Sequence, residues 1–232
     1  QKVYEEELER IVKKHCKKIN LVISGGCALN CVANSNLKRN IWIMPNPGDS
    51  GSSLGCIPAV TKQKLNWKGP FLGYDIRGEY PVDRIIKELE TNKIVGVASG
   101  RAEFGPRALG NRSLLADPRG DEIKDKVNAI KKRQKFRPFA PSILLEDVHD
   151  YFEMPQETSP YMQFVGKCKY PKEFPAIIHA DGTSRVQTVT KEDNEGFYNL
   201  LKTWKDKTGC PMLLNTSLNI KGMPMVNDRW DA

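Results

Sequence analysis

Short apolar runs that alternate with turn-forming residues constrain the fold of this chain more than any other feature. Beyond residue 81 these runs predict strands, at 94–99, 142–145, 161–165, 176–179, 186–189 and 212–214. Apolar residues at helical spacing predict helices, at 82–89, 121–133 and 195–206. Many short strands with few helices indicate an α+β domain built on a twisted mixed sheet.

The first 62 residues have a different order of elements. A helix is predicted at 3–18, a short buried strand at 21–23 and another short strand at 41–44, and each strand is followed by a glycine-rich turn. This order fits an α/β layer, although two strands do not make a sheet with an interior. Residues 61–81 are polar and rich in Gly, Pro, Lys and Tyr, which is typical of a linker. We therefore expect an α/β segment at 1–62, a linker at 63–81 and a second domain at 82–232.

Composition narrows the class of protein. The 232 residues are 39% hydrophobic, which is enough to bury a core without disulfides or metals. The six cysteines form no CxxC pair and the three histidines are scattered, which argues against a zinc site and favours a reducing, cytoplasmic location. No apolar run is long enough to span a bilayer, so no membrane partner is expected. Gln1 is not an initiator, and we expect a cut or processed start with no signal peptide.

The charge balance points to an anionic partner. The chain carries 36 Lys and Arg against 28 Asp and Glu, a net charge of +8. Such a balance suits nucleic acid or phosphorylated small molecules. Aromatic residues make up only 8% of the chain and are not interleaved with its basic block, so nucleic acid is the less favoured partner.

The segment 99–119 has the composition of a phosphate-binding site. Three glycines, three arginines and one carboxylate follow a predicted strand within fourteen residues: Gly100, Arg101, Glu103, Gly105, Arg107, Gly110 and Arg112. Glycines let backbone N–H groups approach an anion, and arginine forks match phosphate oxygens. Arg107 and Arg112 lie among Gly, Pro, Ala and Leu, where a charge needs a partner. Because Glu103 is only one carboxylate, we expect an anionic ligand to balance them.

Further cationic and polar groups lie downstream, each with a plainer alternative. Lys131, Arg133, Lys135 and Arg137 form a second basic block, which could instead be a solvated surface. The prolines after Arg137 present it rigidly or simply make a corner. Arg185 follows an Asp-Gly turn signal. Asn215, Ser217 and Asn219 end an apolar run, where they either bind a phosphate or cap a turn.

Two glycine turns in the first part form another candidate site. Residues 24–30 and 48–55 are both glycine-rich, and the second turn carries Asp49. A single glycine turn is a weak signal. Two close together suggest a nucleotide pocket with a metal-binding carboxylate.

Taken together, these runs resemble the O-carbamoyltransferases of nodulation-factor and antibiotic (tobramycin- and cephamycin-type) tailoring. The similar stretches occur in family order and cover nearly the whole chain: SGGCALNCVAN (24–34), GDSGSSLG (48–55), GRAEFGPRALGNRSLLADPR (100–119), RPFAPS (137–142), DGTSRVQTV (181–189) and LLNTSLNIKGMP (213–224). The resemblance implies a first domain of actin/hexokinase-like fold, of which residues 1–62 are the tail. It implies that residues 82–232 form a YrdC-like domain.

The resemblance also implies an enzyme and its reaction. Carbamoyl phosphate and ATP, with Mg²⁺, give carbamoyl-adenylate and pyrophosphate in the second domain. The carbamoyl group then passes to a small acceptor hydroxyl in the first domain, near a metal such as Fe²⁺. The family's first domain begins far upstream with histidine ligands that this chain lacks, so the upstream half of the same enzyme is an expected partner. The alternatives are an RNA-binding or tRNA-modification module and a truncated, non-catalytic domain.

The resemblance assigns the site residues. Those expected to hold the reacting phosphates are Arg107, Lys131, Arg137, Arg185 and Ser217. Those expected to contact the cofactor are Gly25, Gly26, Asn30, Gly51, Arg101, Glu103, Arg112, Asn215 and Asn219. Asp49 is the expected metal ligand.

Overall fold

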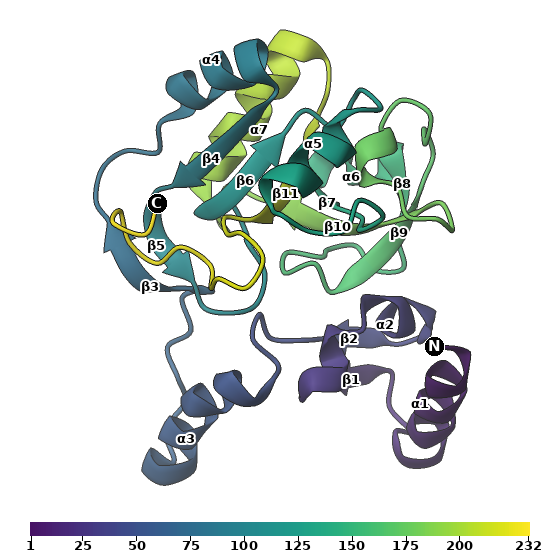
Figure 1. The fold of residues 1–232 in the computed structure, drawn as a ribbon. Helices are drawn as coiled ribbons and strands as arrows, with labels where there is room; N and C mark the ends of the chain where they lie inside the picture. Colours follow the sequence, from purple (N-terminus) through teal and green to yellow (C-terminus); the bar gives the residue numbers. More distant parts are fainter.

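A seven-stranded mixed sheet forms the centre of the larger domain in the computed structural model, which describes residues 1–232 (Figure 1). The strand order is β4-β6-β11-β7-β10-β9-β8. The pair β10–β7 is parallel, and the other five pairs are antiparallel. The strands are β4 (Ile94–Ala98), β6 (Arg112–Ala116), β7 (Ala140–Leu144), β8 (Phe152–Glu153), β9 (Phe164–Cys168), β10 (Thr183–Val189) and β11 (Met212–Ser217).

Helices α4 (Val82–Asn92) and α7 (Glu195–Thr208) lie side by side and pack on this sheet (Figure 1). The Asn194 side chain caps α7 by accepting a hydrogen bond from the Phe197 N–H, at 3.1 Å. Gly209 ends the same helix with a φ of 72°, a left-handed conformation that suits glycine. Two shorter helices, α5 (Ile123–Ile130) and α6 (Val148–Tyr151), complete the domain.

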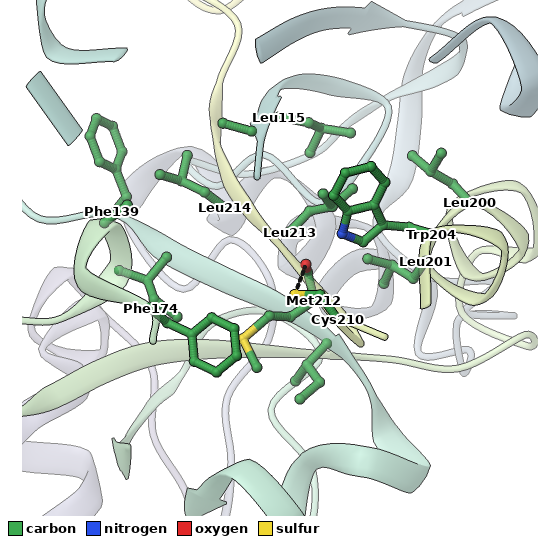
Figure 2. Packing of buried hydrophobic residues seen from close by; sticks show 14 of the residues in the cluster. Leu115, Phe139, Phe174, Leu200, Leu201, Trp204, Cys210, Met212, Leu213 and Leu214 are labelled. Atoms are coloured by element: carbon green, nitrogen blue, oxygen red, sulfur yellow. Dashed lines mark hydrogen bonds between the residues drawn. The ribbon is translucent and has the colours of Figure 1, made fainter. Parts of the chain in front are cut away.

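The core lies between α7 and the central strands (Figure 2). The buried face of α7 carries Phe197, Leu200, Leu201 and Trp204, which recur at helical spacing. In β11, successive residues from Met212 to Leu214 are all buried, so this central strand is covered on both faces. Such a continuous apolar run is expected of a strand with no solvent-facing side.

A smaller N-terminal unit lies against the larger domain. It contains α1 (Lys2–His15), β1 (Asn20–Val22), α2 (Cys31–Asn36), β2 (Asn40–Trp42) and α3 (Ser52–Thr61). Strands β1 and β2 pair in parallel with each other and with no other strand.

Helix α2 attaches this unit to the edge of β9. Strand β8 pairs only with Lys167 and Cys168, which leaves the start of β9 without a strand neighbour on that side. The Ser35 Oγ accepts the Val165 N–H at 2.9 Å, and the Asn34 amide donates to the Gln163 carbonyl at 3.1 Å. The side chains of α2 therefore satisfy backbone groups that an exposed strand edge would leave open.

Most of the predicted elements are present, including helices near 3–18, 82–89, 121–133 and 195–206. Four predictions need correction. The predicted linker contains β3 (Phe71–Ile76), which pairs with β5 (Gly100–Glu103) in a separate two-stranded sheet. The apolar run at 176–179 is not a strand, because 175–177 form a 3₁₀ turn, and the strand predicted at 161–165 lies at 164–168. The strand at 21–23 was predicted to be buried, yet Val22 is 69% exposed, and Trp42 of the neighbouring strand is 55% exposed.

No helix of the structure is both long enough and apolar enough to cross a membrane.

Replacing Trp204 by alanine is expected to lower the free energy of unfolding by about 3 to 5 kcal/mol, because the buried indole would leave a cavity. Trp204 is 1% exposed, whereas Trp230 is 83% exposed. The Trp230→Ala variant is the matched control and is expected to change the free energy by no more than about 0.5 kcal/mol. Urea unfolding measures both, and equal losses in the two variants would contradict the packing.

Candidate functional site

Two arginines from separate elements come together without an acidic partner. Arg107 lies in the loop after β5, and Arg185 lies on β10. Neither guanidinium makes a hydrogen bond or ion pair within the chain, and the Arg185 Nε is buried with no acceptor. Burial, followed by the charges of Arg107 and Arg133, lowers the pKa of Arg185 to about 10. Cations that repel one another in a partly desolvated place favour the binding of an anion.

Lys131, at the end of α5, is a buried cation of the same kind. Its ammonium donates to the Ser217 carbonyl, to the Ser217 Oγ at 3.3 Å, and to the carbonyl and Oδ1 of Asn219 at 3.0 and 2.9 Å. No carboxylate faces it. Burial and the nearby Arg133 charge lower the pKa of Lys131 to about 8. The predicted residues Lys131, Ser217 and Asn219 are thus brought together.

A cleft of about 280 Å³ opens beside Lys131. Its lining is cationic and polar, and consists of Lys131, Arg133, Gln134, Arg137, Ser217, Asn219, Ile220, Lys221 and Gly222. The charge of Arg133 acts on both Lys131 and Arg185, so the cleft and the arginine pair belong to one cationic region. Arg137 lies at the exposed rim of this cleft. We call the five residues Arg107, Lys131, Arg133, Arg137 and Arg185 the cationic site.

The prediction overlooked Asn128, which holds one wall of the cleft. Its side chain is fully buried on α5 and donates to the carbonyls of Lys135 and Arg137, at 3.0 and 3.1 Å. Its Oδ1 accepts from the Arg133 Nε at 2.6 Å, and that guanidinium lies 4.5 Å from the Phe139 ring centre. A polar residue on the apolar face of α5 was the available signal for this function.

The Arg112 guanidinium has all of its hydrogen-bond partners within the chain. Its side chain is fully buried and donates only to backbone carbonyls, which belong to Tyr74, Ser99, Gly100, Asn111 and Asn227. The sequence argument required an anion to balance Arg112, but carbonyl dipoles from five residues meet the same need. We therefore correct the expectation, and assign Arg112 to joining β3, β5 and the C-terminal segment, which runs past β5 in Figure 1.

Glu103 and Asn215 also have internal partners. One carboxylate oxygen of Glu103 accepts three backbone N–H groups, from Leu109 at 2.7 Å, Asn111 at 2.9 Å and Arg112 at 3.2 Å. Burial raises the pKa of Glu103, and these N–H groups act in the opposite direction. The buried Asn215 amide donates to the Ala108 carbonyl at 3.1 Å.

Asn215 is part of a buried polar network that joins the arginine loop to the sheet. Its amide also donates to Ser142 Oγ and Gln187 Oε1, at 3.0 and 2.9 Å. The Gln187 amide donates to the Leu109 carbonyl at 3.2 Å. Arg101 is exposed on β5, where its guanidinium lies 3.4 Å from the Gly73 carbonyl, and is not brought into the cationic site.

The two glycine turns of the N-terminal unit lie together, because the Gly25 N–H donates to the Pro47 carbonyl at 2.7 Å. Gly26 opens the 3₁₀ turn that follows, and the Asn30 side chain caps α2 by accepting the Ala33 N–H at 3.2 Å. A Cβ on Gly51 would lie 1.7 Å from the Asn46 carbonyl oxygen, so this turn requires glycine.

Asp49 is exposed, and the structure holds no group of three or more His, Cys, Asp or Glu side chains arranged for a metal. The residues of this chain therefore do not by themselves make a site that fits a metal such as Fe²⁺.

Comparison with known proteins decides the family. The profile of the carbamoyltransferase C-terminus matches residues 86–232, and that of the carbamoyltransferase N-terminus matches residues 2–57. This chain belongs to the carbamoyltransferase family. The resemblance inferred from its motifs is thereby confirmed.

Several curated proteins are similar to this carbamoyltransferase chain. It is 37% identical to nodulation protein NolNO of Sinorhizobium fredii, over 98% of this chain and 40% of that protein. It is 38% identical to nodulation protein U of the same organism, over 88% and 40%. An uncharacterised protein of Methanocaldococcus jannaschii is 37% identical, over 92% and 47%. The chain thus spans less than half the length of each of these relatives.

A solved structure is also similar to this chain. The structure of full-length HypF in its phosphate- and nucleotide-bound form aligns with a TM-score of 0.46 and 20% identity, over 69% of this chain and 20% of that one. A likeness of this size carries no argument about function. This carbamoyltransferase chain itself has a mixed α/β domain with a seven-stranded sheet.

The two kinds of arginine are expected to respond oppositely to replacement by methionine. Arg112→Met should lower the free energy of unfolding by at least about 3 kcal/mol, because several buried carbonyls would lose their donors. Arg185→Met should stay within about 1 kcal/mol of the wild type or raise stability, because it removes a repelled, unpaired charge. Thermal and urea unfolding measure both. A larger loss in Arg185→Met than in Arg112→Met would contradict these contacts.

Anion binding by the cationic site is expected to weaken as pH rises through the pKa of Lys131, about 8. The ammonium is present below that pKa and lost above it, so affinity for sulfate, whose charge is constant, should fall roughly tenfold one pH unit above the pKa. Calorimetric titration at about pH 7 and about pH 9 measures the change. Lys131→Arg should flatten the profile, because arginine stays charged throughout. The exposed Lys172→Arg is the control, and an unchanged slope in Lys131→Arg would contradict the assignment.

Proposed function

We propose that this chain carries the carbamoyl-adenylate-forming domain of an ATP-dependent O-carbamoyltransferase, with a YrdC-like domain at 82–232. The observation that carries the proposal is the pair Arg107 and Arg185, which lie together with no acidic partner in a region that also contains Lys131. Membership of the carbamoyltransferase family supplies the substrate class.

The proposed reaction joins two polyanions, so its main physical demand is to offset their repulsion. Water first cleaves carbamoyl phosphate into carbamate and phosphate. A carbamate oxygen then bonds to the α-phosphorus of ATP, and the P–O bond to pyrophosphate breaks. The products are carbamoyl-adenylate, pyrophosphate and phosphate. In this proposal Arg107 and Arg185 bind carbamoyl phosphate. Lys131, Arg133 and Arg137 bind the phosphates of ATP, with Mg²⁺ neutralising part of their charge.

Alignment and charge neutralisation are enough for a reaction of this kind. The phosphoryl groups need no protein nucleophile, and the cationic site offers fixed guanidinium and ammonium groups instead. Asn128 and the buried network of Asn215 hold the backbone of the site in place, so the cations are preorganised before the substrates bind.

The second half-reaction is proposed to need an upstream half of the same protein, of actin/hexokinase-like fold. Strands β1 and β2 pair only with each other, and their exposed Val22 and Trp42 suit a further packed layer. That half would supply the pocket for a small acceptor hydroxyl and the remaining ligands of a metal such as Fe²⁺, with Asp49 as one ligand. Gly25, Gly26, Asn30 and Gly51 would form the nucleotide-contacting turns there. The six unpaired cysteines are consistent with a cytoplasmic location.

Carbamoyl phosphate is expected to raise the melting temperature, because a ligand that binds only the folded state stabilises it. At about 100 times its Kd the ligand adds about 2.7 kcal/mol, or roughly 5 to 10 °C for a chain of this size. Addition of ATP should then release pyrophosphate. Arg107→Ala should remove both effects, whereas Arg77→Ala, at an exposed arginine with no partner, should keep both. A folded wild type with no shift and no pyrophosphate would refute the proposal.

One observation favours a second function, the binding of RNA. Phe136 is 77% exposed between Lys135 and Arg137, so the expectation that no aromatic residue is interleaved with the basic block is wrong. Phosphate-backbone binding would fall steeply with salt and need no small ligand. Filter binding of tRNA at two salt concentrations separates this function from the first, while pyrophosphate release excludes a non-catalytic domain.

A further inference from the structure

We propose that Glu103 is an internal hydrogen-bond acceptor that shapes the arginine loop, residues 104–111, and so positions Arg107 for an external anion. The identity of that external anion rests on the proposed function, but the place of Glu103 does not. Glu103 is a positioning residue in this scheme and has no contact with substrate. The proposal replaces the expectation that Glu103 binds the cofactor.

The geometry of the carboxylate carries this inference. Glu103 Oε1 accepts N–H groups from Leu109, Asn111 and Arg112, at 2.7, 2.9 and 3.2 Å. The three donors are close in the chain and converge on one oxygen. Convergent backbone N–H groups of this kind form an anion-binding concavity. Here the chain fills the concavity with its own side chain.

The rest of the loop is fixed around this contact. Gly105 and Gly110 have φ values of 152° and 118°, which other residues rarely adopt. A Cβ on Gly105 would lie 2.6 Å from the Pro45 carbonyl oxygen, and one on Gly110 would lie 2.5 Å from the Phe197 ring. Tyr80 donates its hydroxyl hydrogen to the Gly110 carbonyl at 2.8 Å. Packing therefore fixes the backbone conformation of the loop that carries Arg107.

This internal acceptor changes how the glycine-rich segment binds phosphate. In a phosphate-binding glycine loop the backbone N–H groups face the ligand. In this loop three of them face Glu103, so they are not available to a substrate. No hydrogen bond or ion pair within the chain engages the Arg107 guanidinium, and burial lowers its pKa. A fixed loop keeps that guanidinium in place before binding, which reduces the entropy lost on association.

Chemical rescue tests the inference. Glu103→Ala should weaken carbamoyl phosphate binding at least about tenfold, because the three N–H groups lose their acceptor and the loop loosens. Formate should restore most of the affinity by entering the emptied concavity. Formate should not rescue Arg107→Ala, and sodium chloride at equal ionic strength should not rescue Glu103→Ala. Glu192→Ala, at an exposed glutamate, is the matched control.

Amide hydrogen exchange gives a second readout that needs no substrate. The amides of Leu109, Asn111 and Arg112 should lose protection in Glu103→Ala and regain it in formate. If Glu103→Ala is too unstable to purify, Glu103→Gln takes its place. It keeps one acceptor oxygen, so its amides should stay protected and formate should have no effect.

The outcomes separate this inference from the proposed function. Unchanged protection of the three amides in Glu103→Ala, or lost affinity that formate fails to restore, would overturn the positioning role of Glu103. A wild type that does not bind carbamoyl phosphate would refute the proposed function, while formate-dependent protection in Glu103→Ala would still support that positioning role.

Discussion

The stability of this structure depends on how its buried charged groups are compensated. Lys131 and Arg185 are desolvated cations with no carboxylate partner, and burial lowers the pKa of each. Such groups weaken a fold, so the stability that holds them must come from the core between α7 and the central strands. We interpret these unpaired cations as groups that are kept free to bind an anion. They lower the stability of the domain that contains them.

Arg107 and Arg112 illustrate what sequence can and cannot say about such charges. Both lie in one motif among small and apolar residues, and the same argument applied to each. Arg112 meets carbonyls from segments as distant as Tyr74 and Asn227, whereas Arg107 meets none. The difference is set by chain segments far away in sequence, so residue type and local spacing could not reveal it. Glu103 was equally ambiguous, because its partners are backbone amides with no sequence signature.

The helices and strands also differ in whether the local sequence predicts them. Helix α7 was predictable because its cap, its apolar spacing and its terminal glycine are all local. Strand β3 was missed, because its apolar run Phe71–Ile76 is interrupted by Gly73 and Asp75 and lies in a segment rich in Gly, Pro and Lys, and its partner β5 lies further along the chain. The run at 176–179 has the apolar residues of a strand, but Pro175 and packing against α5 make it a 3₁₀ turn. Local sequence patterns predicted most of the helices and strands. The elements that they did not predict depend on contacts between segments distant in the sequence.

The residue pair Arg185 and Val165 links the cationic site to the contact between the N-terminal unit and the larger domain. Arg185 on β10 is the register partner of Val165 on β9, and the Val165 N–H donates to Ser35 of α2. Helix α2 is thus linked to Arg185 through the sheet. An anion bound by Arg185 would therefore lie one strand away from the contact that holds the N-terminal unit.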